Sequence, residues 1–87
     1  MKPTNLLPYG NIKTPDDLAK VVRERRKQQG ATQAEFASLC GVGVRFISDL
    51  ENGKPTVQFG KLLQVVQCLG LELVIRARGW EQREMTQ

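Results

Sequence analysis

Two charged side chains, Arg45 and Asp49, stand in the mostly apolar stretch GVGVRFISDL, and their types suit hydrogen bonding to the edges of nucleic-acid bases. A guanidinium can bind guanine at two points in the DNA major groove, a carboxylate can accept from the cytosine amine, and a side chain such as Val44 can touch a thymine methyl. The alternative is that Arg45 and Asp49, four residues apart, simply pair along a helix surface. A third interpretation is that Asp49 serves mainly to aim Arg45.

The spacing of apolar residues around this pair predicts a helix over 44–51. Ile47 and Leu50 lie at positions i and i+3 and must face the core. The outward side of the helix then carries Val44, Arg45, Ser48 and Asp49. Asn52 and Gly53 follow, and they favour the left-handed backbone that often ends a helix.

A second short helix is predicted immediately before this one. Thr32 and Glu35 form a capping box, in which the hydroxyl and the carboxylate each satisfy a backbone donor at the helix start. The helix ends at Gly41, and Val42-Gly43 form a tight turn. Two short helices joined by such a turn therefore precede residue 52.

Longer helices are predicted on both sides of this pair. Pro15 follows an N-cap threonine and starts a helix over 15–29. A last helix over 57–69 has a broad apolar face. Gly60 within it is unfavourable by about 1 kcal/mol relative to alanine, which indicates a start nearer residue 59 or a close neighbour. Together the elements form the helix-turn-helix arrangement.

The segment LELVIRAR, residues 71–78, alternates apolar and polar residues and predicts a single β-strand, although a helix also fits. A lone strand leaves backbone hydrogen-bonding groups unpaired, so we expect it to pair with the same strand of a second copy. The alternative partner, residues 1–13, contains two prolines that disfavour a strand. The residues expected to seal the dimer are Leu71, Leu73 and Ile75.

Eighty-seven residues suffice for one domain with a small core. We expect an N-terminal arm over 1–13, a helical DNA-binding domain over 14–70, the dimerising strand over 71–78 and a flexible tail over 79–87. Leu6, Leu7 and Tyr9 of the arm would pack on the domain. In the tail, Trp80 would either cap the strand ribbon or anchor a partner.

Composition argues against an enzyme. The chain has no histidine, no nucleophile paired with a base, no phosphate-binding glycine loop and no metal-ligand cluster, so we expect no catalytic site, metal or cofactor. Its formal charge of +4 suits an anionic partner.

Cys40 and Cys68 are interpreted as small buried hydrophobes rather than as a redox pair. No apolar run approaches the roughly 18 residues of a membrane span, and no signal-peptide core is present, so we expect a cytoplasmic protein.

The stretch RRKQQGATQAEFASLCGVGVRFISDLENGKPTV strongly resembles the Cro/C1-type (XRE) DNA-binding domain, through its TQ-x-E-x-A helix start, its glycine turn and its LENGK helix end. The resemblance covers residues 18–70. The longer run FISDLENGKPTVQFGKLLQVVQCLGLEL is similar to the HipB antitoxin group that accompanies HipA-like kinase toxins. This implies an all-α, lambda-repressor-like fold of four to five helices plus one C-terminal β-strand that pairs across a homodimer.

The resemblance also implies roles for individual residues. Gln33 would bind a DNA phosphate and brace the start of the reading helix. Arg26 and Glu51 would form a partly buried charged pair between the first and third helices. Some of the run Arg23, Arg25, Arg26 and Lys27 is expected to meet the DNA backbone, with a solvated face as the alternative. The positions that face base edges are Val44, Arg45 and Asp49, and those near phosphates are Ser48, Asn52 and Lys54.

The leading hypothesis is a dimeric repressor that binds a palindromic operator and acts as the antitoxin of a HipA-like kinase toxin, built as one chain or as two. The second is a stand-alone phage-type or metabolic repressor without a toxin partner. The third is a protein-interaction adaptor that uses the helix-turn-helix scaffold without binding an operator.

Overall fold

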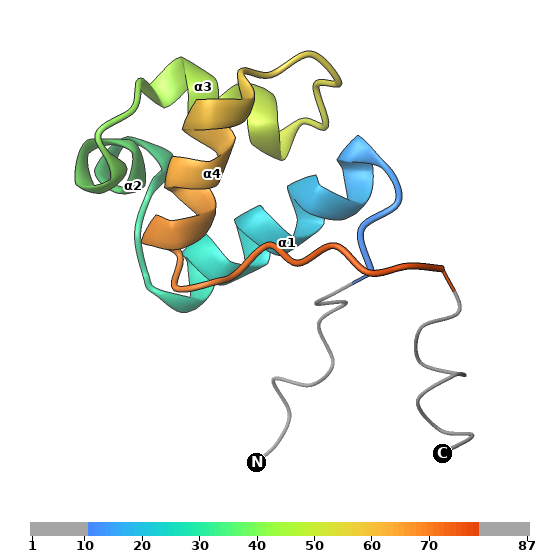
Figure 1. The fold of residues 1–87 in the computed structure, drawn as a ribbon. Helices are drawn as coiled ribbons and strands as arrows, with labels where there is room; N and C mark the ends of the chain where they lie inside the picture. The colour runs from blue at the N-terminus through green and yellow to red at the C-terminus, as the bar shows by residue number, and fades with distance from the viewer. Residues whose placement is uncertain (1–10, 79–87) are drawn as a thin grey trace.

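The computed structural model describes residues 11–78, and these form four α-helices (Figure 1). They are α1 (Pro15–Gln28), α2 (Gln33–Cys40), α3 (Val44–Glu51) and α4 (Phe59–Cys68). All four predicted helices are confirmed, and the described residues contain no fifth. The bounds of α3 are the predicted ones, 44–51. Helix α4 begins at residue 59, the later of its two predicted starts.

Two capping boxes fix where α1 and α2 begin. In α2 the Thr32 hydroxyl accepts from the Glu35 amide at 3.1 Å, and the Glu35 carboxylate accepts from the Thr32 amide at 2.9 Å. The predicted box is therefore confirmed. In α1, Thr14 is the predicted N-cap, and it forms a second reciprocal box with Asp17. Each box satisfies backbone donors that a helix start leaves without partners.

The core lies where α1 and α2 pack against α3 and where α2 packs against α4. In Figure 1 the short helices α2 and α3 lie on one side of the molecule and α1 passes below them. The largest side chains of the core are fully buried: Val22, Phe36, Ile47, Val65 and Leu69. Every helix contributes at least one of these residues, so all four helices share one core.

Cys40 and Cys68 form a disulfide that joins the C-terminal ends of α2 and α4, with 5.6 Å between their Cα atoms. The interpretation of both as unbonded buried hydrophobes was wrong. Cys40 is buried as expected, but Cys68 is only half-buried. A second contact holds the same junction, because the Gln64 amide nitrogen donates to the Cys40 carbonyl at 2.6 Å.

The segment after α4 differs from its prediction. Residues 71–77 have no regular secondary structure, so the strand predicted over 71–78 is not formed within the described chain. The physical reason is that a strand needs a ladder partner, and none of the described residues supplies one. Leu71 packs against the core, whereas Leu73 and Ile75 are exposed, Ile75 to 93%.

Some predictions lie outside the described residues, namely those for Leu6, Leu7 and Tyr9 of the arm and for Trp80 of the tail. Within residues 11–78, no helix combines the length and the apolar character needed to cross a bilayer. The same residues contain no group of three metal-binding side chains.

Candidate nucleic-acid interface

The turn between α2 and α3 is built from two glycines in different conformations. Gly41 ends α2 with a φ of +76°, a left-handed conformation that glycine adopts without the Cβ penalty. Gly43 is extended and forms the N-cap of α3. Only three residues, 41–43, therefore separate the end of α2 from the start of α3.

One face of α3 is buried and the opposite face is open. Ile47 and Leu50 are at most 2% exposed, as their spacing predicted. Val44 is 49% exposed, and Arg45 beside it is also exposed. Ser48 and Asp49 are half-buried. The helix thus presents its N-terminal half to solvent while its apolar side stays in the core.

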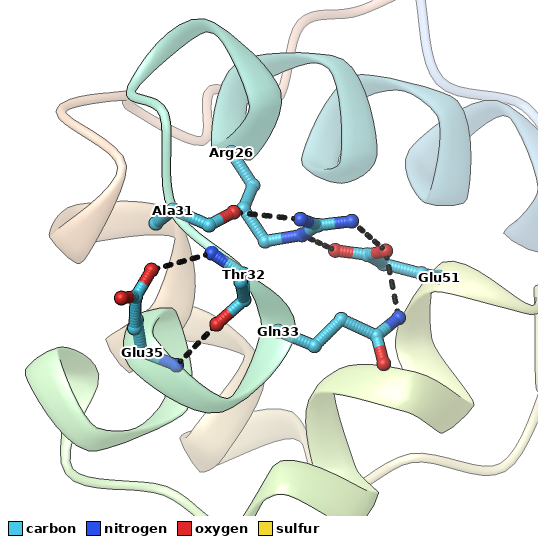
Figure 2. A network of polar contacts seen from close by, with 6 residues as sticks. All are labelled: Arg26, Ala31, Thr32, Gln33, Glu35 and Glu51. Carbon is cyan, nitrogen blue, oxygen red and sulfur yellow. Dashed lines mark hydrogen bonds and ion pairs between the residues drawn. The ribbon is translucent and has the colours of Figure 1, made fainter.

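A buried ion pair fixes the other end of α3 (Figure 2). The carboxylate of Glu51 accepts from Arg26 Nε at 2.6 Å and from Nη2 at 2.9 Å, which confirms the expected pair between the first and third helices. The third nitrogen of Arg26, Nη1, donates to the Ala31 carbonyl at 2.7 Å. All the guanidinium nitrogens of Arg26 are therefore occupied inside the protein.

The environment of this pair favours its ionised form. Burial has the largest influence on the pKa of Glu51 and raises it, but hydrogen bonds from Arg26 and Gln33 and the charges of Arg26 and Arg23 together lower the pKa below its ordinary value. The hydrogen bond to Glu51 is the main cause of a raised pKa for Arg26. Both groups therefore remain charged at neutral pH.

Gln33 connects the start of α2 to the same carboxylate. Its side-chain amide nitrogen donates to Glu51 Oε1 at 3.0 Å (Figure 2). Gln33 was expected to brace the start of the reading helix, whereas this hydrogen bond is made to the last residue of α3. Gln33 is half-buried, so part of its side chain is still accessible.

Asp49 pairs with Lys54 and not with Arg45. The Lys54 ammonium lies 3.5 Å from Asp49 Oδ2, because the chain folds back after α3 and the Lys54 amide donates to the Asp49 carbonyl at 3.0 Å. Within residues 11–78 the Arg45 guanidinium has no hydrogen-bond or ion-pair partner. Arg45 is thus free to bind an external acceptor, and a cation offsets the charge of Asp49.

The predicted site residues divide into two groups. The exposed ones are Val44, Arg45, Asn52 and Lys54, the half-buried ones Gln33, Ser48 and Asp49. Arg26 belongs to neither, because it lies 9% exposed inside the domain. Arg25 has a structural role that its sequence context did not indicate, because its Nε donates to the Leu69 carbonyl at 2.9 Å. The only available signal was that a basic side chain can bind the carbonyls at the end of a helix. Using that signal for Arg25 requires knowing that α1 lies beside the end of α4.

Comparison with known proteins places this geometry in a family. The helix-turn-helix family model matches residues 22–75. An uncharacterized HTH-type transcriptional regulator, y4mF of Sinorhizobium fredii (strain NBRC 101917 / NGR234), is 56% identical over 68 residues, which cover 78% of this chain and 90% of the relative. Antitoxin HipB of Escherichia coli O6:H1 is 27% identical over 71 residues, which cover 82% and 76% of the two chains.

Solved structures agree with the sequence matches. The HipB-O4 20mer complex superposes with a TM-score of 0.71 at 27% identity, covering 80% of this chain and 99% of that one. The HipA-HipB-O2-O3 complex gives the same TM-score and coverage. These relatives are regulators and antitoxins and not enzymes. The chain therefore belongs to the Cro/C1-type (XRE) helix-turn-helix family of DNA-binding transcriptional regulators.

Proposed function

We propose that this chain is a repressor that reads a palindromic operator as a homodimer, with α3 as the reading helix. The observation that carries the proposal is the division of α3 into a fixed side and an open side. Ile47 and Leu50 hold it in the core, and Glu51 is tied to Arg26, while Val44 and Arg45 remain accessible. A helix held in this way can enter a major groove without rearranging the domain.

The free guanidinium of Arg45 supports a role in base recognition, as a bidentate donor to guanine. Val44 would contact a thymine methyl. Asp49 would accept from a cytosine amine or aim Arg45, and its pairing with Lys54 reduces the repulsion that a lone carboxylate would meet near phosphates.

The remaining polar residues around α3 are proposed to contact the DNA backbone. Exposed Asn52 and Lys54 and half-buried Ser48 lie along or just after the helix and suit phosphate contacts. Gln33 would brace Glu51 and assist a phosphate contact at the start of α2. Arg26 is left out of the proposed contacts, because its donors are already bound to Glu51 and Ala31.

The dimer is proposed to form through residues 71–77. Leu73, Val74 and Ile75 leave an apolar surface exposed in a segment without a ladder partner among the described residues. A second copy of the same segment could supply both the hydrogen bonds and the apolar cover. Two reading helices about 34 Å apart would then enter successive major grooves on one side of the duplex.

We also propose that the protein is the antitoxin of a HipA-like kinase toxin, made of one chain or of two, and that it acts in the cytoplasm. Support comes from the similarity to HipB over 80% of this chain, since HipB has been solved in a HipA-HipB-O2-O3 complex. The alternative, a stand-alone repressor, is favoured by y4mF, the 56% identical relative described only as a regulator.

Two measurements test these proposals. Fluorescence anisotropy with the duplex upstream of this chain's own coding region should show tight binding that is lost when either half of the palindrome is scrambled. Equal affinity for the scrambled duplex would rule out sequence-specific repression and favour the adaptor.

Co-expression with the product of the adjacent gene should recover a stable complex with a kinase-like protein. DNA binding without such a complex would support the stand-alone repressor.

A further inference from the structure

Three contacts converge on the C-terminal end of α4. Cys68 is bonded to Cys40 at the end of α2, and Arg25 of α1 donates to the Leu69 carbonyl at 2.9 Å. Gly70 then adopts a φ of +77°, and the Leu71 amide donates to the Val66 carbonyl at 3.1 Å. Together these contacts fix the direction in which residues 71–77 leave the domain.

Of these three contacts, the Cys40–Cys68 disulfide is the one that a redox reaction can break and re-form. A regulator that binds chromosomal DNA works where thiol reductants keep most cysteines reduced, and disulfides found there are usually transient or redox-sensing. Cys40 is 6% exposed, whereas Cys68 is half-buried and is the last residue of α4. A reductant can therefore approach the bond from the Cys68 side.

We propose that the Cys40–Cys68 pair is a reversible redox clamp that fixes the exit of residues 71–77 and thereby sets the operator affinity of the dimer. The proposal rests on the proposed function, because it takes residues 71–77 as the dimer contact. The oxidised pair holds the segment in one direction relative to α3. The reduced pair leaves the segment without a covalent link, held by the hydrogen bonds from Arg25 and Leu71 and by the packing of Leu71 against the core.

The chemistry is a thiol–disulfide exchange with a dithiol as reductant. One thiolate of the dithiol attacks Sγ of Cys68, the bond to Cys40 breaks, and Cys40 leaves as a thiolate that takes up a proton. The second thiol of the reductant then displaces Cys68 from the mixed disulfide. Two electrons and two protons have passed to the protein, which gains two thiols, and the reductant has become a disulfide. Exchange with an oxidised dithiol reverses the step.

Reduction should leave the fold intact, because the contacts between α2 and α4 do not depend on the bond alone. Phe36 on α2 and Val65 on α4 are both fully buried, and Gln64 still reaches the Cys40 carbonyl. The change is therefore expected at the end of α4 and not in the centre of the core.

Hydrogen exchange tests the clamp without DNA. The full chain is compared after oxidation with oxidised glutathione and after reduction with dithiothreitol, with zero and two titratable thiols confirming the two states. The amides of Leu69, Gly70 and Leu71 should exchange at least about tenfold faster after reduction, and those of Val22 and Ile47 should change much less. An equal rise at all five amides would mean that the bond only stabilises the whole domain, which would overturn the proposal.

Operator binding tests the consequence. With the duplex from the chain's own upstream region, reduction should weaken binding by about five- to tenfold, because the dimer contact is less preorganised. The double variant Cys40→Ala/Cys68→Ala should bind like the reduced protein in both buffers. Equal affinity of the oxidised and reduced wild type would overturn the redox proposal while leaving repression intact. Loss of DNA binding in both states, with the exchange difference retained, would instead count against the proposed function.

Discussion

Arg26 and Glu51 form a two-point ion pair inside the domain, with Nε 2.6 Å from Oε2 and Nη2 2.9 Å from Oε1. Glu51 is the last residue of α3, and Arg26 lies in the last turn of α1. Their side chains are 3% and 11% exposed. The pair therefore sets the orientation of α3 from within, at the end of the helix away from Arg45.

Removing one member of this pair should destabilise the domain strongly. Glu51→Ala leaves the Arg26 guanidinium buried without its counter-ion, and we expect a loss of about 3–5 kcal/mol in the free energy of unfolding. Urea denaturation followed by circular dichroism measures this loss. The double variant Arg26→Met/Glu51→Leu is the control, because it removes both charges together and should lose less than Glu51→Ala alone. A larger loss in the double variant would show that packing, not charge, explains the effect.

The same pair should make stability depend on acid pH. The pKa of Glu51 is lower in the folded than in the unfolded state, so its contribution is fully present above its ordinary pKa of 4.5 and is lost as the pH falls through the lower folded value. The urea midpoint should therefore decline below about pH 5. Glu51→Gln should be less stable at pH 7 and show a flatter acid limb. Asp17, whose pKa is lowered mainly by the Lys13 amide, accounts for part of the limb that remains, and Asp17→Asn checks this.

Gly53 should tolerate alanine less well than Gly30, although both are left-handed, with φ of +76° and +73°. At Gly30 a methyl group would meet open space, so Gly30→Ala reports the backbone penalty alone, about 1–2 kcal/mol. At Gly53 the methyl would collide with Asp16 Oδ1 and force that side chain to rotate, adding about 0.5–1.5 kcal/mol. Asp16→Ala should recover this extra cost in the Gly53→Ala background. Equal losses in the free energy of unfolding for Gly30→Ala and Gly53→Ala would show that the close approach of Asp16 adds nothing to the cost at Gly53.

The helices could be predicted because their signals are local. Ile47 and Leu50 define the buried side of α3, and flanking glycines define its ends. Contacts between elements could not be predicted in the same way. The spacing along the helix made Arg45 a candidate ion-pair partner for Asp49. Lys54 is the observed partner, because the chain turns back after Gly53. The disulfide joins residues 28 positions apart on different helices, and no periodicity reports that their sulfurs face each other.

Arg45 and Lys54 should differ in what they contribute to operator binding. Arg45→Ala should cost about 1–3 kcal/mol on the preferred duplex and relax the preference at one base pair of each half-site. Lys54→Ala should weaken binding to all sequences similarly and reduce the salt slope by about one. Anisotropy titrations over a series of salt concentrations and single-base duplex variants measure both effects.

Arg45→Lys is the matched control, because it keeps the positive charge and loses the two-point geometry. We expect it to retain the salt slope of the wild type but to lose the base preference. An unchanged base preference in Arg45→Ala would exclude Arg45 from direct reading of the operator.

Ile75 offers the clearest test of the proposed dimer, because it is 93% exposed in the single chain. Ile75→Asp should therefore leave the folding of the monomer unchanged, and any effect must arise in an assembly. A carboxylate buried in an apolar ribbon is costly, so we expect the dimer dissociation constant from sedimentation equilibrium to rise by at least about tenfold. Operator affinity should fall with it, since one reading helix contacts only half of the site.

Val74→Asp is the matched control, because Val74 is also exposed, to 60%, and its side chain would point to the other side of an extended segment. If Leu71, Leu73 and Ile75 form the buried side of the ribbon, Val74→Asp should weaken the dimer much less than Ile75→Asp. Equal weakening would mean that both sides of the segment are covered on assembly. An intact dimer in Ile75→Asp would instead place the contact elsewhere on the chain, and the half-site spacing expected from the ribbon would have to be abandoned.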